Sequence, residues 1–286
     1  MERKYLPMFY HIPKCAGTYA LVQQLKLLNF YKNNIEISKF PDRKENQILF
    51  TKDNHILLRA LIIDKEKYLE SKKNLLKLNP ISFSTTIEDL YDISQNTDFF
   101  STVLTSSGVI MEKEILKSLP AEVRRWSMMR NPFDWAKSMY YYTKSEQSSH
   151  EDYHDRFQSV NFEEFLKSKE IPSNAYVKFF LKKERSKTVI NESLYQEAKA
   201  NIEDIRIFDI KNCDKAIDEI FSECHGIKLK DLPEEIHRRF EKANTNVTKN
   251  LGKEKFEDMS YEAKAKFLEI NKWDIKLYHE VIQNKK

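Results

Sequence analysis

Short apolar runs alternate with longer amphipathic stretches over much of the chain, and this alternation predicts strands and helices in turn. Strands are predicted at Tyr5–Ile12, 46–51, Phe99–Thr105, Arg125–Met129 and Ile205–Ile210. Apolar residues at helical spacing predict a helix over Tyr19–Phe30, and Pro132 at a helix start predicts another that runs to about Lys144. A short helix over Glu112–Leu119 is predicted to stop at Pro120.

The order of strand and helix along the chain predicts an α/β fold, in which a central parallel β-sheet is flanked by helices. Residues from about His55 to Leu78 are rich in Lys, Leu and Glu, so we expect a helical insertion at about 55–98. The stretch 145–160 is polar and has no periodicity, which predicts a mobile loop. Beyond it the pattern predicts a mainly helical C-terminal part, within a single domain over residues 1–286.

Composition narrows the classes of function. The 48 basic and 44 acidic residues leave a net charge of +4, too balanced for a chain that coats nucleic acid. The three cysteines are odd in number and lack metal-ligand spacing, so we expect a reducing compartment and no metal ion. No apolar run is long enough to cross a bilayer. We therefore expect a cytoplasmic protein, and the richness in Lys, Asn and Ile indicates a bacterial origin. The sequence predicts no oligomeric state.

The segment HIPKCAGT, residues 11–18, lies where the first predicted strand ends and the first predicted helix begins. A turn of this kind aims free backbone N–H groups at one point, and the helix dipole adds positive potential there. Lys14 supplies a full positive charge, and Gly17 permits close approach of the backbone. These features predict an anion site; the alternative is an ordinary turn with a surface lysine.

A second candidate anion site, RNPFDWAKSMYYY at residues 130–142, follows the strand Arg125–Met129. Arg130 stands at the strand end and Ser138 lies two helical turns later, so both side chains can face one phosphate. Ligands of open α/β sheets bind at the carboxyl ends of the strands. Two anion sites at that edge predict one ligand with phosphate groups at both ends.

Together the two segments resemble the cofactor signatures of the sulfotransferases that use 3′-phosphoadenosine 5′-phosphosulfate (PAPS), and most of all the carbohydrate O-sulfotransferase branch. HIPKCAGT resembles the 5′-phosphosulfate loop, H-x-P-K-x-x-G-T, and RNPFDWAKSMY resembles the 3′-phosphate signature, R-[ND]-P-x-x-R-x-x-S-x-Y. Two weaker similarities lie near the C-terminus. NTNVTK, residues 244–249, resembles a late Asn-rich loop, and INKWDIKLYHEV, residues 270–281, resembles the closing Asp-x-x-Leu-Tyr helix.

The resemblance implies a single P-loop-like sulfotransferase domain that moves a sulfonyl group from PAPS to a hydroxyl of a carbohydrate or glycolipid. Adenosine 3′,5′-bisphosphate would be the second product, and no metal ion would take part. Lys14 would be catalytic, and the cofactor-binding residues would be Lys14, Cys15, Ala16, Gly17, Thr18, Tyr19, Arg130 and Ser138. Trp135 stands where the family often has arginine, which puts one 3′-phosphate contact in question.

A general base must also take the proton of the acceptor hydroxyl. The His that related enzymes often carry after the central strand is missing from TVLTSSGVIMEKE, residues 102–114. The candidates are His55, Glu112 and His11, of which we choose His55 because it follows the second predicted strand. Glu112 also fits an ordinary charge at a helix start, and His11 fits a packing residue at a strand end.

Two other interpretations stay open. A nucleotide or small-molecule kinase of the P-loop class would need a lysine after the glycine, followed by Ser or Thr, and a Walker-B Asp. For the Walker-B Asp, the nearest candidate is in IRIFDI, residues 205–210. A catalytically degenerate PAPS-binding protein is favoured by the missing His, and tight binding of adenosine 3′,5′-bisphosphate without turnover would distinguish it.

Overall fold

The protein is described from a computed structural model, which describes residues 5–31, 47–52, 55–61, 83–86, 103–106, 122–144, 159–168, 173–181, 188–241 and 254–283. For the strands between 47 and 106 only the backbone is described. The chain divides into two compact units, and the single domain expected over residues 1–286 stays a prediction. Unit 1 is Met1–Met128 with Asp204–Thr245, and unit 2 is Met129–Glu203 with Asn246–Lys286.

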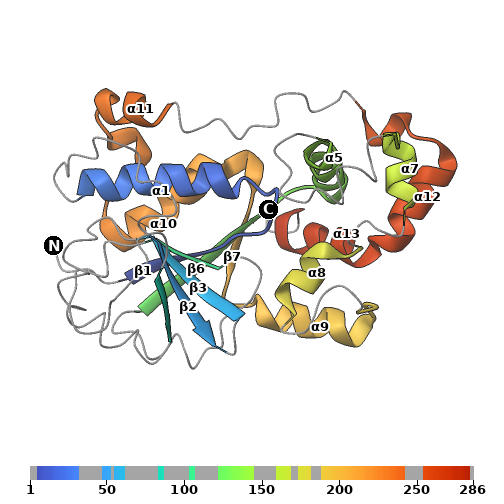
Figure 1. Ribbon diagram of the computed structural model, residues 1–286, viewed down its shortest axis with the longest axis horizontal. Coiled ribbons are helices and arrows are strands. Elements are labelled where there is room, and N and C mark those ends of the chain that lie inside the picture. Colours follow the sequence, from blue (N-terminus) through green and yellow to red (C-terminus); the bar gives the residue numbers. More distant parts are fainter. Residues whose placement is uncertain are drawn as a thin grey trace. The chain divides into compact units, whose positions relative to one another are not determined.

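Unit 1 contains a seven-stranded sheet of order β4-β2-β3-β5-β1-β6-β7 (Figure 1). The strands are β1 (Tyr5–Tyr10), β2 (Gln47–Lys52), β3 (His55–Leu61), β4 (Phe83–Thr86), β5 (Val103–Ser106), β6 (Glu122–Met129) and β7 (Arg206–Asp209). β1 pairs in parallel with β5 on one side and with β6 on the other. The expected α/β class with a parallel centre is therefore confirmed, although β3 runs antiparallel to both of its neighbours.

The helical insertion expected at about 55–98 is wrong at two places, where β3 and β4 are strands. The apolar run HILLRAL of β3 is compatible with a helix or a strand when only its sequence is considered. In the sheet, its backbone N–H and C=O groups meet partners on β2 and on β5. Pairing on both sides satisfies the backbone of this segment, and that decides in favour of a strand.

The helices of unit 1 are α1 (Gly17–Tyr31), α10 (Cys213–His225) and α11 (Glu234–Glu241), with the 3-10 turns η2 (Ile210–Asn212) and η3 (Leu229–Asp231). α10 contacts both α1 and β1 (Figure 1). The core below them includes Phe9 and Trp126, which are almost fully buried with ring centroids 4.5 Å apart. These apolar residues anchor β1 and β6, the two strands that lead to the candidate anion sites.

Unit 2 is helical. Its elements are α5 (Pro132–Thr143), α7 (Phe162–Lys167), α8 (Ala175–Phe180), α9 (Glu192–Asn201), η5 (Phe256–Asp258), α12 (Tyr261–Ile270), α13 (Lys272–Tyr278) and the π-helical turn η6 (His279–Gln283). Phe133 packs edge-on against Phe162, Phe256 and Phe267, with centroids 5.5, 5.2 and 5.8 Å apart. Such pairs add about 0.5–1.5 kcal/mol each beyond the area they bury. They hold the start of α5 against α7 and α12.

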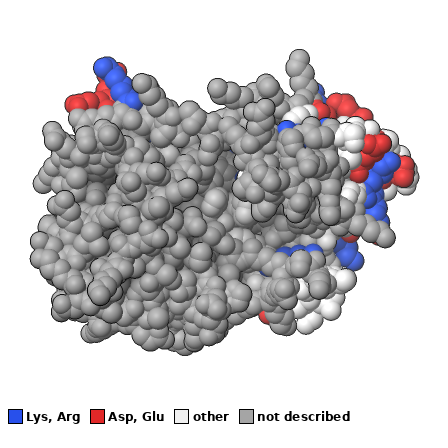
Figure 2. Space-filling view, in the orientation of Figure 1, with Lys and Arg blue, Asp and Glu red and all other residues white. Residues whose placement is uncertain are grey.

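Charges of both signs are interspersed over the surface of α7 and α12 (Figure 2). Lys167 pairs with Glu262 at 3.4 Å, and Lys266 with Glu269 at 2.9 Å. A mixed surface of this kind is an ordinary solvated helix face rather than a site for a polyanion.

The remaining sequence predictions divide between those that the structure describes and those that it does not. β1, α1, β2, β6, α5 and β7 lie within a few residues of their predicted positions, and β5 overlaps the end of its predicted strand. The helix predicted over Glu112–Leu119, the segment NTNVTK and nearly all of the loop predicted at 145–160 lie outside the described residues. Among the described helices, none is long and apolar enough to cross a membrane, and no described side chains cluster as metal ligands.

Candidate functional site

The loop between β1 and α1 holds two non-glycine residues in the left-handed backbone region. Lys14 has a φ of 63° and Ala16 a φ of 56°, whereas φ of Cys15 between them is not positive. A residue with a side chain held in this region costs about 1–3 kcal/mol. Left-handed residues of this kind occur in loops whose backbone N–H groups converge on an anion, which makes this loop a candidate anion site.

Helix α1 begins directly after this loop. The Ala20 N–H donates to the Ala16 carbonyl at 2.9 Å as the first turn closes. The N–H groups of Gly17, Thr18 and Tyr19 stand in that first turn, where no intrahelical carbonyl is available to them. The candidate loop is therefore followed directly by a helix start, a position that favours anions.

Cys15 and Tyr19 have structural contacts of their own within unit 1. The Cys15 N–H donates to the Ile12 carbonyl at 3.2 Å, and the Cys15 side chain is fully buried. The Tyr19 hydroxyl donates to Oδ1 of Asp214 at 2.7 Å. Burial, followed by this carboxylate, raises the pKa of Tyr19 well above its usual 10. We therefore expect Tyr19 to contact an anion through its backbone N–H and not through its phenol.

Gly17 lies against the ring of His11, the residue that follows β1. A Cβ atom on Gly17 would lie 1.9 Å from both Cδ2 and Nε2 of His11. The His11 ring also stacks on Phe9, with centroids 6.0 Å and planes 19° apart. These contacts support the interpretation of His11 as a packing residue, and they give the physical reason for glycine at position 17.

The register of the sheet places His55 at the same edge as the Lys14 loop. Phe9 of β1, Thr105 of β5 and Arg59 of β3 form one row across the sheet. Because β3 runs antiparallel to β5, His55 stands four positions beyond that row, toward the carboxyl end of β1. Lys14 lies in the loop that leaves β1 at this same edge. β3 lies two strands from β1, which is about 10 Å at the usual spacing.

Arg130 follows the last residue of β6 and differs from two arginines earlier in that strand. Arg124 pairs with Glu223 at 2.5 Å, and Arg125 forms an ion pair with Asp204. Arg130 is half-buried, and no carboxylate of the described residues lies within ion-pair distance of it. A half-buried guanidinium in this situation is suited to bind a phosphate.

The residues after Arg130 start a helix. The Asn131 side chain accepts the Phe133 N–H at 2.9 Å, and Pro132 takes the first helical position. Ser138, two turns into α5, is buried with 3% of its surface exposed. α5 therefore carries Ser138, its candidate phosphate-binding residue, on a buried face.

Trp135 occupies the position at which the sulfotransferases that the motif resembles often have arginine. Its ring is buried and packs edge-on against Tyr176, with centroids 6.0 Å apart. The side chain therefore packs inside unit 2, and any contact that an arginine would make there has to come from another residue.

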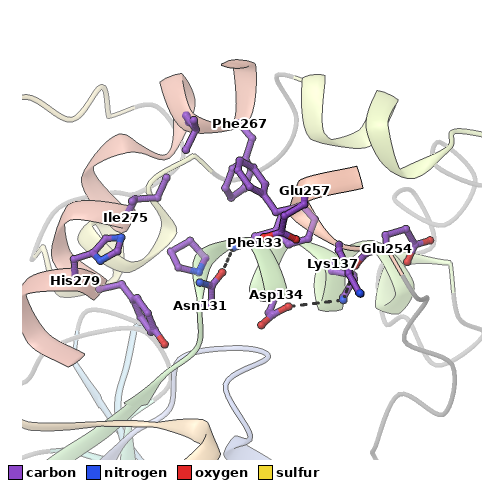
Figure 3. A pocket seen from close by; sticks show the side chains of 14 residues that line it. Asn131, Phe133, Asp134, Lys137, Glu254, Glu257, Phe267, Ile275 and His279 are labelled. Atoms are coloured by element: carbon purple, nitrogen blue, oxygen red, sulfur yellow. Dashed lines mark hydrogen bonds and ion pairs between the residues drawn. The ribbon is translucent and has the colours of Figure 1, made fainter. Parts of the chain in front are cut away.

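A cavity of about 400 Å³ opens in unit 2 beside the start of α5 (Figure 3). Asn131 and Phe133 line it from α5, and Phe267 lines it from α12 (Figure 3). The Lys137 ammonium donates to the Glu254 carbonyl at 3.0 Å, which ties the segment before η5 to α5. The volume and the mixed lining suit a small ligand with polar groups and an apolar face.

No protein-family model matches the chain. Searches among curated proteins and among solved structures find no match either. The function is therefore inferred from the motifs and from the geometry of the two candidate sites.

The structure places the sequence-predicted site residues in two groups. Residues 14–19 form one continuous loop and helix start in unit 1, and His55 stands at the same edge of its sheet. Arg130 and Ser138 belong to unit 2, at the start and in the second turn of the α5 segment. Glu112 lies outside the described residues.

Tyr176 and Asp274 were not predicted as site residues from the sequence. The Tyr176 hydroxyl donates to the Arg130 carbonyl at 2.7 Å across 46 residues of sequence. Asp274 in turn accepts the backbone N–H of Tyr176 at 2.9 Å. The segment INKWDIKLYHEV gave a signal for Asp274, but no local pattern could relate Tyr176 to Arg130.

Proposed function

We propose that the protein is a PAPS-dependent sulfotransferase that transfers a sulfonyl group to a hydroxyl of a carbohydrate or glycolipid. The observation that carries the proposal is the strained loop after β1, with Lys14 and Ala16 left-handed directly before a helix start. Strain of this kind is kept where backbone N–H groups must converge on a ligand. The motif resemblance then favours phosphosulfate over other phosphate-containing anions.

PAPS, when bound, supplies the sulfonyl group, and its transfer leaves adenosine 3′,5′-bisphosphate. Lys14 and the N–H groups at the start of α1 would hold the 5′ end and neutralise the charge that develops on the leaving oxygen. Arg130 and Ser138 would hold the 3′-phosphate. The proposal includes no metal ion, because Lys14 and the helix start supply the positive potential at the leaving group.

His55 is the proposed general base. It would accept the proton of the acceptor hydroxyl while the acceptor oxygen bonds to sulfur and the bond from sulfur to the phosphate oxygen breaks. Its support is the sheet register, which puts the start of β3 at the edge where β1 leads into the Lys14 loop. A positioned base of this kind contributes roughly 10²–10⁴ to the rate.

The proposed acceptor class comes from the resemblance to carbohydrate O-sulfotransferases. The cavity beside Asn131 supports it, because a lining that combines aromatic and charged side chains suits a polyhydroxylated ring. No observation favours the P-loop kinase. Asp209, the nearest candidate for a Walker-B residue, accepts the Lys211 N–H at 2.9 Å and so has an ordinary role at the start of η2.

A ligand screen tests the proposal. The thermal midpoint of the chain is measured with adenosine 3′,5′-bisphosphate, ATP and NAD, each with and without Mg²⁺. We expect the bisphosphate to stabilise the fold most, by about 2.7 kcal/mol at a concentration 100 times its Kd, and Mg²⁺ to have no effect. Stabilisation by ATP that requires Mg²⁺ would favour the kinase, and the absence of any nucleotide effect would refute the proposal.

Turnover is tested by transfer of labelled sulfonate from PAPS to a panel of saccharides and glycolipids. The wild-type chain should label at least one acceptor class, Lys14→Ala should not, and Lys215→Ala serves as the matched control. Lys215 lies exposed on α10 in the same unit. Bisphosphate binding without turnover on any acceptor would support the degenerate PAPS-binding protein instead.

A further inference from the structure

The backbone carbonyl of Arg130 has a specific buried partner. The phenol of Tyr176 donates to this oxygen at 2.7 Å, and Tyr176 is fully buried. Its ring also packs edge-on against Trp135 on α5. The hydrogen bond fixes the orientation of the planar peptide that joins Arg130 to Asn131, and so restrains the backbone that carries the Arg130 side chain.

Tyr176 stands on a helix that is too short to hold its own position. α8 has six residues, well below the length at which an isolated helix is stable. Its N-cap residue, Asn174, is left-handed with a φ of 50° and makes no side-chain bond to the first turn of α8. The cap comes from α13 instead, where the Asp274 carboxylate accepts the N–H groups of Tyr176 and Val177, each at 2.9 Å.

The contact between α8 and α13 is reciprocal. Oδ1 of Asn174 accepts the N–H of Trp273 at 3.0 Å and the N–H of Asp274 at 3.3 Å, in the first turn of α13. Oδ1 of Asn271 accepts the Asn174 N–H at 3.3 Å. Each helix therefore caps the other, and the left-handed conformation of Asn174 directs its amide toward α13. Asn174, Asn271 and Asp274 are all buried, so solvent does not compete for these bonds.

A buried carboxylate is a costly way to join two helices, because its hydration must be replaced by hydrogen bonds. An apolar contact would join α8 to α13 at a lower cost, but it would leave the start of α8 free to shift. Two directional bonds from Asp274 fix that start and with it the position of the Tyr176 hydroxyl.

We propose that Asp274 and Tyr176 are positioning residues for Arg130, with Asp274 fixing the start of α8 and the Tyr176 hydroxyl fixing the Arg130 carbonyl. The inference rests on the proposed function, because it takes Arg130 to bind the 3′-phosphate of the nucleotide. It predicts that loss of these contacts weakens the binding of nucleotides with a 3′-phosphate and leaves the binding of other nucleotides unchanged.

The test uses Tyr176→Phe in the full chain, which removes the hydroxyl and keeps the ring against Trp135. Binding is measured by calorimetry with adenosine 3′,5′-bisphosphate and with adenosine 5′-monophosphate, which lacks the 3′-phosphate. The measurements are made at pH 8, because burial raises the pKa of Asp274 to about 7 and its carboxyl is then ionised. We expect the bisphosphate Kd to rise roughly three- to tenfold, as for one lost hydrogen bond, and the monophosphate Kd to stay unchanged.

Three further single variants and one double variant control the result. Tyr140→Phe removes a similar bond in the same unit, from the Tyr140 hydroxyl to the Val160 carbonyl at 3.0 Å, and should keep the wild-type ratio of the two Kd values. Arg130→Ala should weaken binding of the bisphosphate. Adding Tyr176→Phe to Arg130→Ala should cause no further loss of affinity. Asp274→Asn, which keeps one acceptor oxygen, should shift the ratio in the same direction as Tyr176→Phe.

The outcomes separate this inference from the proposed function. A wild-type chain that does not prefer the bisphosphate over the monophosphate overturns both. A wild-type preference that persists unchanged in Tyr176→Phe overturns the positioning role alone. If Tyr176→Phe does not fold, the ratio measured in Asp274→Asn decides, and an unchanged ratio there overturns the positioning role.

Discussion

The contact between Gly17 and His11 predicts that Gly17→Ala damages both the fold and nucleotide binding. The added Cβ would lie 1.9 Å from two atoms of the His11 ring and 2.7 Å from a third, Cγ. Because Cγ lies on the Cβ–Cγ axis about which the ring turns, turning the ring leaves Cγ in place and does not relieve the overlap. Either the ring leaves its stack on Phe9, or the loop that carries Gly17 moves.

The expected magnitude combines two opposing effects. Forcing an extra methyl group into a packed site costs about 1–3 kcal/mol. Alanine forms helix better than glycine by up to about 1 kcal/mol, and Gly17 is the first residue of α1. Gly17 has no positive φ, so the alanine meets no backbone strain there. We therefore expect the free energy of unfolding to fall by about 1–2 kcal/mol.

Urea unfolding measures this loss, and calorimetry with adenosine 3′,5′-bisphosphate measures the effect on binding. Removing the ring should remove the clash, so His11→Ala/Gly17→Ala should be no less stable than His11→Ala alone. Gly226→Ala is the matched control, because Gly226 ends α10 with a φ of 69° and an alanine there is strained whatever residue 11 is. An equal loss from Gly17→Ala with and without the His11 ring would refute the proposed clash.

Three further predictions concern catalysis and pH. Lys14→Ala should lower kcat for sulfonyl transfer by roughly 10²–10³-fold, and turnover near the wild-type rate would exclude Lys14 from catalysis. His55→Ala should lower kcat by about 10²–10⁴-fold at an unchanged bisphosphate Kd, and an unchanged kcat would remove His55 as the base. Burial raises the pKa of Asp274 from 3.8 to about 7, although the N–H groups of Tyr176 and Val177 and the charge of Lys178 lower it. The stability that the protonated carboxyl contributes is therefore full below about pH 4 and is lost as pH rises to 7. The unfolding free energy of the wild type minus that of Asp274→Asn should fall by about 2–3 kcal/mol from pH 5 to pH 8, and a difference that stays flat or rises would contradict this.

The parts of the fold that local signals specify could be predicted from the sequence. The apolar run of β1, the turn residues after it and the helical spacing of α1 are neighbours in the chain, as are β6, its Arg130 end and the Pro132 helix start. Each pattern reflects burial or backbone chemistry within about a dozen residues, so it is visible without the rest of the molecule. The candidate anion loops and the residues proposed to bind PAPS were therefore accessible to sequence reasoning.

Contacts between distant segments decided the rest. HILLRAL became β3 because β2 and β5 supply backbone partners on both sides, and only that antiparallel strand brings His55 to the edge of the Lys14 loop. Tyr176 reaches Arg130 across 46 residues, and Asp274 reaches Val177 across 97. The sequence by itself determined which segments are candidates for anion binding, because the chain carries those groups side by side. The tertiary structure alone decided what orients them, because hydrogen bonds and close packing depend on which distant groups the folded chain brings together.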